Sequence, residues 1–476
     1  MKVLYVTSEA VPFASSGGLG DVAGSLPAAL RKRLIGCRVV LPMYEDIPKH
    51  LRDGMKFITS LSVPVSWRRQ YCGIFEAKHN GVIYYFLDNQ YYFKRANLYG
   101  HYDDAERFAF FARAVLEMLP HLDGFKPDII EANDWQSALV PVYYSLYYAN
   151  REDYSGIKTV FTIHNIQYQG KYGTELLDDV FGLPKEALSI MECDKCINLM
   201  KGAIETANAV TTVSPTYAGE ILDPWYAHGL DAILRARSWK LTGILNGIDT
   251  DSYNPETDKD IEVNYNAGTL KDKHKNKLAL QRELGLPERK DVPLYGMVTR
   301  LVAHKGIDLV KAVLEEMLQA DLQVAVLGSG DWEYESFFTD MAEKYPGKLA
   351  VKLGFIKDLS RRIYAGSDFF LMPSKSEPCG LAQMIALRYG TVPIVRETGG
   401  LKDSVTDSGD GEGNGFTFKS YYAHDLLNAI WRAFEAYGNK KGMTILAERA
   451  MACDNSWGTS ANRYIKLFKA LLKQKD

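Results

Sequence analysis

The feature that most constrains the fold is an alternation, along the whole chain, of short β-rich runs with segments of helical spacing. The runs in the first half read KVLYVTSE, CRVVLPMY, VIYYFLD, DIIEAND, KTVFTIHN, AVTTVS and KLTGILNGI, and those in the second half read PLYGMVTRL, QVAVLGSGD, AVKLGFI, FFLMPS and TVPIVRETGG. Segments such as DDAERFAFFARAVLEML separate them. This alternation is typical of parallel sheets covered by helices. Because 476 residues exceed what one hydrophobic core usually holds, we expect an α/β protein with two doubly wound, Rossmann-like domains.

A polar segment indicates where the two domains meet in the sequence. Residues 250–290 begin with TDSYNPETDKDIEVNYNAGTLKDKHKNK, which is rich in turn formers and poor in apolar periodicity. We therefore predict domains at residues 1–250 and 251–455. Residues 456–476 read as an amphipathic helix that we expect to pack back on the first domain. Ligands of such sheets bind at the carboxyl ends of the strands, so we expect the two domains to face a central cleft with loops of both.

Composition narrows the classes of partner. A hydrophobic content of 46% is enough to fill two cores, and a net charge of -3 argues against bulk binding to nucleic acid or to an anionic membrane. No apolar run approaches the length of a membrane span, and the chain enters a strand without a signal-like segment, so we expect a cytoplasmic location. Nothing in the sequence indicates an oligomeric state.

The six cysteines are too sparse for a disulfide framework. Cys193 and Cys196 form the only close pair, C-D-K-C. No second Cys or His pair lies nearby, so the sequence favours two reduced structural thiols over zinc binding or redox use.

The first strand is followed by SSGGLGDV, a glycine-rich turn. Gly17, Gly18 and Gly20 precede a helix-like pattern that starts near Asp21. Glycine lacks the Cβ that would block close approach of a phosphate, and a helix N-terminus is electropositive. The spacing is not that of the dinucleotide fingerprint G-x-G-x-x-G. A plain tight turn and a ligand-binding loop both fit the sequence here.

Further polar loops each follow one of the predicted strands, and they span residues 133–136, 164–165, 246–249, 299–306, 328–331 and 374–381. In TRLVAHKG, Arg300 and Lys305 could clamp a diphosphate whose negative charge grows as a bond to it breaks. A surface or salt-bridge role is the alternative for such a pair. The glycines of Thr398-Gly399-Gly400 form a second turn that resembles the first.

A carboxylate and an imidazole also end predicted strands. Glu377 follows FFLMPS, and the residues after it open a helix whose free amides could meet phosphate or sugar hydroxyls. A favourable charge at a helix start is the alternative for Glu377. His164 could hydrogen-bond a substrate or be a satisfied structural histidine. The D-x-D patterns at 249–251 and 258–260 lie in the polar segment, and we assign no metal to them.

Eight motifs together resemble a known family. SSGGLGDVAGSLP, NDWQSAL, FTIHNIQYQG, VSPTYAGEI, ILNGID, VTRLVAHKGIDL, SKSEPCGLAQM and VRETGGLKDSV look, in order and spacing, like the bacterial glycogen synthases and plant starch synthases of glycosyltransferase family 5. The resemblance implies the glycosyltransferase B fold. It also implies transfer of glucose from ADP-glucose to the 4-hydroxyl at the non-reducing end of an α-1,4-glucan, with retention of configuration and with no metal or other cofactor. The implied partners are a nucleotide sugar and an α-glucan.

The resemblance also implies roles for residues. Arg300 and Lys305 would stabilise the diphosphate leaving group, Glu377 would hold glucose hydroxyls and support developing positive charge, and His164 would contact the sugar near its 6-hydroxyl. The donor would be bound by the second domain and by the glycine turn of the first, through Ser15, Gly17, Gly18, Leu19, Asn246, Phe355, Cys379, Gly380 and Leu381. The acceptor would be bound by the first domain, through Asp21, Tyr99, Asp134, Trp135 and Asn165. Since Glu377 is the only obvious carboxylate, we favour same-face attack over a glycosyl-enzyme intermediate.

Three positions depart from the family pattern. Ser15 stands where many relatives have Lys, Asn133-Asp134-Trp135-Gln136 stands for His-Asp-Trp-His, and Phe355 stands where bacterial relatives can place Tyr. These departures leave two alternatives: a related retaining transferase that uses UDP-glucose or another acceptor, and a non-catalytic glucan-binding homologue. Ile385, where many relatives of the first kind carry a second carboxylate, favours the glycogen synthase interpretation. The lack of G-x-G-x-x-G disfavours a nicotinamide-dependent oxidoreductase.

Overall fold

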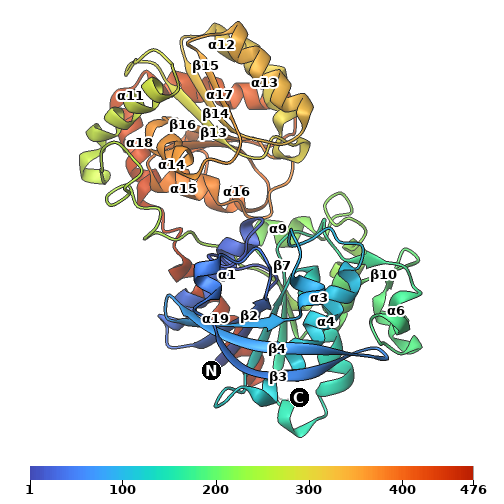
Figure 1. The fold of residues 1–476 in the computed structure, drawn as a ribbon. Helices are drawn as coiled ribbons and strands as arrows, with labels where there is room; N and C mark the ends of the chain where they lie inside the picture. The colour runs from blue at the N-terminus through green and yellow to red at the C-terminus, as the bar shows by residue number, and fades with distance from the viewer. Residues whose placement is uncertain (475–476) are drawn as a thin grey trace. The chain divides into compact units, whose positions relative to one another are not determined.

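The structure, a computed structural model, describes residues 1–474 except for the side chain of Asp410. The chain divides into two compact units (Figure 1). Unit 1 comprises Met1–Leu245 together with the C-terminal segment from Trp457, and unit 2 comprises Asn246–Ser456. Each unit is built on its own sheet.

Unit 1 contains a nine-stranded sheet in the order β12-β11-β7-β6-β1-β2-β5-β4-β3. The strands are β1 (Lys2–Val6), β2 (Gly36–Pro42), β3 (Lys56–Val65), β4 (Arg68–His79), β5 (Val82–Asp88), β6 (Ile129–Asn133), β7 (Lys158–Ile163), β11 (Ala209–Thr212) and β12 (Leu241–Gly243). From β12 to β5 the pairing is parallel, as the alternation of strands and helices predicts. The central strands are buried on both faces, which explains their continuous apolar runs.

One edge of this sheet was not predicted. β4 pairs antiparallel with both β5 and β3, and the short turn after Val65, with Ser66 at φ 53°, joins β3 to β4. β3 is mostly half-exposed, so it lacks the unbroken apolar run that marks the buried strands.

Helices and a small second sheet complete unit 1. The helices are α1 (Gly18–Arg31), α2 (Lys49–Arg52), α3 (Gln90–Phe93), α4 (Asp104–Glu117), α5 (Leu139–Tyr143), α6 (Leu176–Asp179), α7 (Leu188–Met191), α8 (Leu199–Thr206), α9 (Pro215–Glu220), α10 (Asp231–Ala236) and α19 (Trp457–Lys473). The C-terminal helix α19 packs against α1, and Arg33 Nε donates to Asn462 Oδ1 over 2.6 Å. The second sheet has the order β8-β10-β9, with β8 (Lys171–Tyr172), β9 (Glu192–Cys193) and β10 (Cys196–Asn198).

Unit 2 contains a six-stranded, all-parallel sheet in the order β15-β14-β13-β16-β17-β18. The strands are β13 (Leu294–Val298), β14 (Gln323–Gly328), β15 (Leu349–Leu353), β16 (Phe369–Met372), β17 (Val392–Arg396) and β18 (Phe416–Phe418). The helices are α11 (Lys273–Glu283), α12 (Ile307–Gln319), α13 (Trp332–Lys344), α14 (Lys357–Gly366), α15 (Ala382–Arg388), α16 (Gly399–Ser404), α17 (Ala423–Tyr437) and α18 (Lys440–Ala452).

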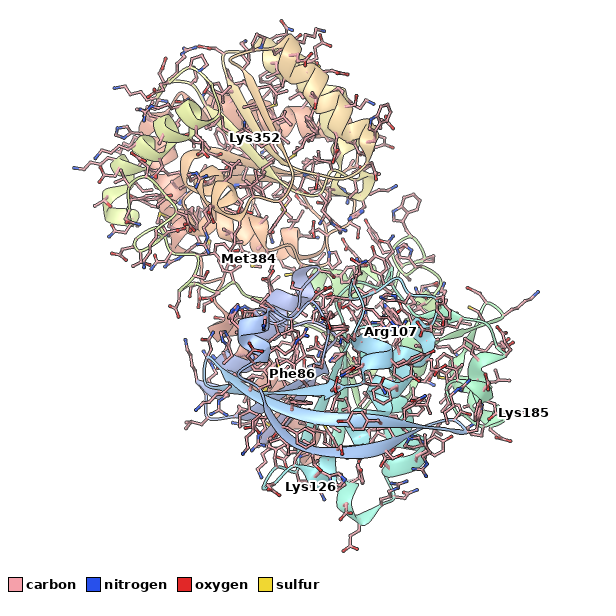
Figure 2. The ribbon with its side chains drawn as sticks, in the orientation of Figure 1. Phe86, Arg107, Lys126, Lys185, Lys352 and Met384 are labelled. Carbon is pink, nitrogen blue, oxygen red and sulfur yellow. The ribbon has the colours of Figure 1, made fainter. Side chains whose placement is uncertain are left out.

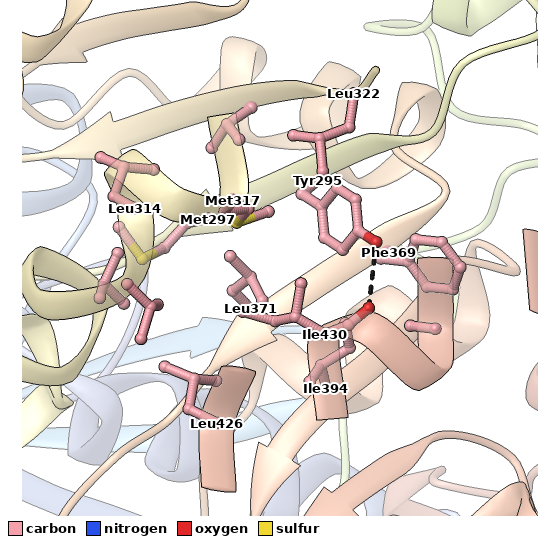
Figure 3. Close-up of a cluster of buried hydrophobic side chains, with 14 of the residues drawn as sticks. Tyr295, Met297, Leu314, Met317, Leu322, Phe369, Leu371, Ile394, Leu426 and Ile430 are labelled. Atoms are coloured by element: carbon pink, nitrogen blue, oxygen red, sulfur yellow. Dashed lines mark hydrogen bonds between the residues drawn. The ribbon is translucent and has the colours of Figure 1, made fainter. Parts of the chain in front are cut away.

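Alternating residues of the strands in unit 2 enter two cores. Tyr295 and Met297 of β13 pack with α12, α13 and α17 on one face, and Figure 3 shows the Tyr295 hydroxyl donating to the Ile430 carbonyl over 3.4 Å. Leu294 packs with α11 and α14 on the other face. The period of two along a strand therefore gives this sheet an apolar layer on each side.

Helix α11 lies inside the segment that the sequence marks as polar and turn-rich. Its buried face is largely polar: Lys277 Nζ donates to Asp368 Oδ2 over 2.6 Å and to the Tyr437 hydroxyl over 2.8 Å. A helix that is fixed through buried polar groups gives no apolar periodicity, which is why the sequence did not predict it.

Both main sheets have a switch point where the order of strands reverses. In unit 1 the chain runs from β1 to β2 on one side and from β6 to β7 on the other, so β1 and β6 flank the switch point. In unit 2 the corresponding neighbours are β13 and β16. Ligands of open α/β sheets bind beyond the carboxyl ends of such strands. Within residues 1–474 no helix is long and apolar enough to cross a membrane.

Candidate active site

In unit 2, the loops after β13 and β16 bring a cation and a carboxylate into contact. Lys305 Nζ lies 2.6 Å from Glu377 Oε2, and Ser374 Oγ donates to the same oxygen over 3.0 Å. Glu377 is 6% exposed, and Ser374 is fully buried. Both donors use Oε2, and within the described chain Oε1 accepts no hydrogen bond. The carboxylate is therefore held in place with one oxygen available to a ligand.

The loop that carries Arg300 and Lys305 is fixed from two sides. A Cβ on Gly306, whose φ is 75°, would lie 2.1 Å from the Pro373 carbonyl oxygen, so only glycine permits this approach of the two loops. On the other side, Leu301 N donates to Ser329 O over 2.8 Å. The Arg300 side chain is exposed and donates no hydrogen bond within residues 1–474. Its charge is thus available to an anion.

The second glycine turn supports Glu377. A Cβ on Gly399 would lie 2.0 Å from the Glu377 carbonyl oxygen, and a Cβ on Gly400 would lie 2.0 Å from that of Cys379. Gly400 N donates to Glu377 O over 3.1 Å. These glycines serve close packing of backbone on backbone, a role that the sequence pattern does not separate from ligand binding.

Three further predicted donor residues of unit 2 differ in how far they are exposed. Asn246 is 5% exposed, and its Oδ1 is buried without a hydrogen-bond partner in the described chain. A buried unpaired acceptor is costly, so this atom is a candidate to accept from a ligand hydroxyl. Phe355, after β15, is 88% exposed, as a ring that stacks on a ligand would be. Burial raises the pKa of Cys379 to about 12, so this cysteine remains a thiol.

In unit 1, a buried glutamate organises the first glycine turn. Glu9, 4% exposed, accepts from Ser16 N (2.6 Å), Ser16 Oγ (2.7 Å), Gly17 N (3.1 Å) and the Tyr99 hydroxyl (2.7 Å). The helix α1 begins at Gly18, and no atom lies within 4 Å of a Cβ added at Gly17 or Gly18. Sequence patterns did not single out Glu9, because it lies at the end of the first predicted strand, before the glycine turn, and its partner Tyr99 is distant in sequence.

Other predicted donor and acceptor positions lie around this turn. Ser15 is exposed, and its hydroxyl donates to Gly17 O over 3.2 Å. Leu19 is buried, whereas Asp21 is exposed in the first turn of α1. The segment before Tyr99 is anchored by Arg107 of α4, labelled in Figure 2, which donates to the Leu98 carbonyl over 3.2 Å.

Asn133 fixes the tautomer of His164. The Asn133 Nδ2 amide donates to Val6 O and Glu131 O, so its Oδ1 must face His164 Nε2, 2.8 Å away. Nε2 therefore carries the proton, and Nδ1 is left as an acceptor. Burial lowers the pKa of His164 to about 3, so the ring is neutral at physiological pH. Sequence analysis placed Asn133 in a candidate loop and counted it as a departure from the family pattern, but assigned it no role of its own.

Asp134 lies beside this pair in a strained conformation. Its φ of 56° with ψ of -180° is a region that residues other than glycine rarely adopt, at a cost of about 1–3 kcal/mol. Its Oδ1 accepts from His164 N over 2.8 Å. The pKa of Asp134 is raised to about 7, chiefly by burial and to a smaller extent by the nearby Glu9 carboxylate, whereas the amides of His164 and Asn165 oppose the shift.

The remaining predicted acceptor residues adjoin Asp134. The Trp135 ring contacts Phe108 with centroids 5.1 Å apart and Tyr172 with centroids 6.2 Å apart. Asn165 is half-buried, and its Oδ1 accepts from Gln167 N over 3.0 Å. The loops after β1, β6 and β7 thus bring His164, Asp134, Trp135 and Glu9 to the switch point of unit 1.

No cluster of three or more His, Cys, Asp or Glu side chains suited to a metal ion occurs among the described residues. In the predicted D-x-D segments, the Asp258 carboxylate pairs with Arg361 at 3.0 Å, and Asp249 Oδ1 accepts from Asp251 N over 3.0 Å.

Comparisons with known proteins determine the family. Residues 2–236 match the starch synthase catalytic domain, and residues 281–448 match the glycosyl transferases group 1. The glycogen synthase of Geobacillus thermodenitrificans (strain NG80-2) is 52% identical over 480 aligned residues, which cover 100% of this chain and 99% of that protein. The chain belongs to the glycogen and starch synthase family. The resemblance inferred from the eight motifs is confirmed.

Solved structures of this family and of the wider fold agree. The catalytic domain of Starch Synthase IV from Arabidopsis thaliana, bound to ADP and acarbose, is 37% identical with a TM-score of 0.91 and covers 99% of both chains. A sucrose-phosphate synthase from Thermosynechococcus elongatus is 17% identical with a TM-score of 0.61, which shows the fold alone. The prediction of two Rossmann-like domains of the glycosyltransferase B class is confirmed.

Proposed function

We propose that this family member is a glycogen synthase, a retaining transferase that moves glucose from ADP-glucose to the 4-hydroxyl at the non-reducing end of an α-1,4-glucan. One observation carries the proposal: Lys305 and Glu377 meet at 2.6 Å at the switch point of unit 2, and the loop of Lys305 also carries Arg300, whose exposed guanidinium makes no hydrogen bond or ion pair within residues 1–474. This set combines cations for a diphosphate with a carboxylate for a sugar that develops positive charge. Relatives that are about 50% identical to this chain over their full length are named glycogen synthases.

Binding of the donor would change the partner of Lys305. Its ammonium is released from Glu377 to the diphosphate, where Arg300 already offers a charge without a competing contact. Ser374 then holds Glu377 Oε2, and Oε1 accepts from the hydroxyls of glucose. As the bond between the anomeric carbon and the phosphate oxygen breaks, the two cations stabilise the leaving group.

The base and the sugar have separate candidates. Phe355 would stack on adenine, and Asn246 Oδ1 would accept from a hydroxyl of the donor. The relative from Arabidopsis was solved with ADP, which supports an adenine nucleotide over a uridine nucleotide. Ser15 supplies no charge at the position where many relatives have Lys.

In unit 1, His164 would contact the transferred sugar as a neutral acceptor. Because Asn133 holds the proton on Nε2, Nδ1 can accept from a sugar hydroxyl such as the 6-hydroxyl. A ring with a pKa near 3 is a poor general base, so we assign His164 to binding and orientation. Trp135, Asp134, Asn165, Tyr99 and Asp21 remain our candidates for the acceptor glucan.

Retention of configuration is assigned to same-face attack. Glu9 is saturated by four donors, so it is not poised as a nucleophile. In Glu377, Ser374 holds Oε2 and we assign Oε1 to the hydroxyls of glucose, so neither oxygen is assigned to attack on the anomeric carbon. The departing phosphate oxygen then accepts the proton of the acceptor hydroxyl. A glycosyl adduct trapped on Glu377 or Asp21 would contradict this mechanism.

The deciding experiment measures release of nucleotide with glycogen as acceptor, using ADP-glucose and UDP-glucose at equal concentrations. We expect glycogen-dependent release of ADP to be the faster reaction. Faster release of UDP would replace the donor in the proposal, and binding of glycogen without turnover of either donor would favour the non-catalytic alternative.

A cytoplasmic location stays a prediction.

A further inference from the structure

Cys193 and Cys196 flank the two-residue turn of a β-hairpin. The proposed activity does not use this hairpin. β9 ends at Cys193, β10 begins at Cys196, and the two residues are direct partners in the antiparallel register. The residues between them, Asp194 and Lys195, have φ of 51° and 61°. Two successive positive φ values are the signature of a type I′ turn, which holds the flanking residues opposite each other.

This register brings the two thiols within bonding reach. Directly opposed residues of an antiparallel pair have Cα atoms roughly 4.5–5.5 Å apart, which lies within the range of about 4.4–6.8 Å found across disulfides. Their side chains leave the same face of the hairpin. Both cysteines are half-buried, and Cys196 Sγ donates to Cys193 O over 3.0 Å, which places its sulfur over the partner residue.

The residues around the hairpin disfavour zinc binding, which is the alternative use of a C-x-x-C pair. Zinc needs four ligands, and no group of three or more His, Cys, Asp or Glu side chains forms a metal site in residues 1–474. The other cysteines are in different places: Cys37, Cys72 and Cys379 are buried, and Cys453 is in unit 2. The hairpin thus presents an isolated and partly accessible dithiol.

We propose that Cys193 and Cys196 form a reversible disulfide that acts as a redox switch on the acceptor side of unit 1. The oxidant is a low-molecular-weight disulfide. One cysteine thiolate attacks it, which forms a mixed disulfide and releases one thiol; the second cysteine then displaces the second thiol and closes the protein disulfide. The two cysteines lose two protons and two electrons, and the small disulfide gains them. In reducing compartments, disulfides of this kind are typically transient and redox-sensing.

The hairpin is connected to the predicted acceptor residues by two routes. β10 pairs with β8, whose Tyr172 contacts the ring of Trp135. At the end of β10, Asn198 Nδ2 donates to Gln169 Oε1 over 2.6 Å, and Gln169 closes the loop that begins at His164. A bond across the hairpin changes its twist, so we expect it to displace Tyr172 and weaken binding of glucan. This consequence rests on the proposed function, whereas formation of the disulfide does not.

The first test detects the bond itself. The full chain is incubated with oxidised glutathione in mildly alkaline buffer, because burial and Asp194 raise the pKa of the Cys193 thiol. Free thiols are then alkylated, and the peptides are weighed. We expect the peptide with both cysteines to be unalkylated and lighter by two hydrogens, and Cys193→Ser and Cys196→Ser each to retain one glutathione. Two free thiols, or two bound glutathiones, in the wild-type peptide would overturn the proposal.

The second test measures the consequence. Oxidised wild type should show a severalfold higher KM for glycogen, an unchanged affinity for ADP, and full recovery with dithiothreitol. The variant Cys193→Ser/Cys196→Ser should not respond, while the control Cys453→Ser, which lacks the other half-buried cysteine, should respond as wild type does. A disulfide with an unchanged KM would overturn the switch. If the reduced enzyme turns over neither nucleotide sugar, the proposed function fails, and the peptide masses still decide the disulfide.

Discussion

The two glycine turns resemble each other in sequence and differ in what surrounds them. A Cβ added to Gly17 or Gly18 in unit 1 meets no atom within 4 Å, whereas a Cβ on Gly399 or Gly400 in unit 2 would lie 2.0 Å from a backbone oxygen. In the first turn the missing side chains leave open space at the start of α1. In the second, they allow the backbone to pack under Glu377. The same glycine pattern therefore leaves space for a ligand in unit 1 and allows the backbone to pack against Glu377 in unit 2.

The buried carboxylates beside these turns differ in the same way. Glu9 accepts four hydrogen bonds, which occupy both of its oxygens. Glu377 receives both of its donors on Oε2. A carboxylate whose oxygens are all used holds a loop, and one with an unused oxygen can bind a ligand. The same substitution at both sites should separate these roles.

The largest effect is expected for Glu377→Gln. The amide keeps the shape of the side chain and removes the charge that supports the sugar, so turnover should fall by about 10²–10³-fold. Affinity for ADP should change little, because this residue acts at the sugar. Steady-state kinetics measures the turnover of the variant and of wild type, and calorimetry measures their affinity for ADP. Wild-type turnover would reject the role of Glu377.

Gly399→Ala should be the most destabilising of these changes. The new Cβ meets the Glu377 carbonyl, and φ at this position is 43°, so we expect a loss of about 2–4 kcal/mol in the free energy of unfolding. Urea denaturation measures it. Gly285→Ala is the matched control, because its φ is 72° but its Cβ would meet no atom within 4 Å. Equal losses for the two variants would mean that strain, and not packing against Glu377, explains Gly399.

Glu9→Gln should destabilise the protein by about 1–3 kcal/mol. The amide has one acceptor oxygen for donors that now reach two, so some of Ser16, Gly17 and Tyr99 lose their partner. Thermal unfolding measures the loss, and turnover should fall less than in Glu377→Gln. A loss of turnover as large as in that variant, with stability unchanged, would make Glu9 a functional carboxylate.

Gly18→Ala tests whether the open space of the first turn admits a ligand. The free energy of unfolding should change by less than about 1 kcal/mol, since no atom opposes the Cβ. If the nucleotide sugar approaches the backbone amide of residue 18, the KM for the nucleotide sugar should rise severalfold in Gly18→Ala. Gly219→Ala in α9, with equally open surroundings, is the control for kinetics. Identical donor KM values in both variants would leave the first turn a plain turn.

Ser15→Lys should have the smallest effect. A charge-assisted contact is worth about 1.5–3 kcal/mol at most, and screening at this exposed position lowers that value. We expect a modest fall in the KM for ADP-glucose that disappears at high salt. Ser15→Gln lengthens the side chain without adding charge, so it should not lower the KM for ADP-glucose. A KM that stays constant in both variants would indicate that the lost cation has been replaced elsewhere.

Sequence patterns predicted the parts of the fold that depend on apolar burial. Strands such as β6 and β13 are buried, so their composition alone distinguishes them from the loops that follow. The antiparallel strand β3 is half-exposed, and α11 is held by buried Lys277, so neither carries that signal. Polar interactions with distant residues leave no periodic trace in the chain.

By itself, the sequence determined the α/β class, the positions of the buried strands along the chain, and the loops in which polar residues follow these strands, because these depend on neighbours along the chain. Only the tertiary structure decided which loops share a switch point, that Ser374 and Lys305 meet on one oxygen of Glu377, that Asn133 sets the tautomer of His164, and that one glycine turn is open while the other is filled. Those properties depend on atoms that are distant in sequence and close in space, and composition and spacing do not encode such distances.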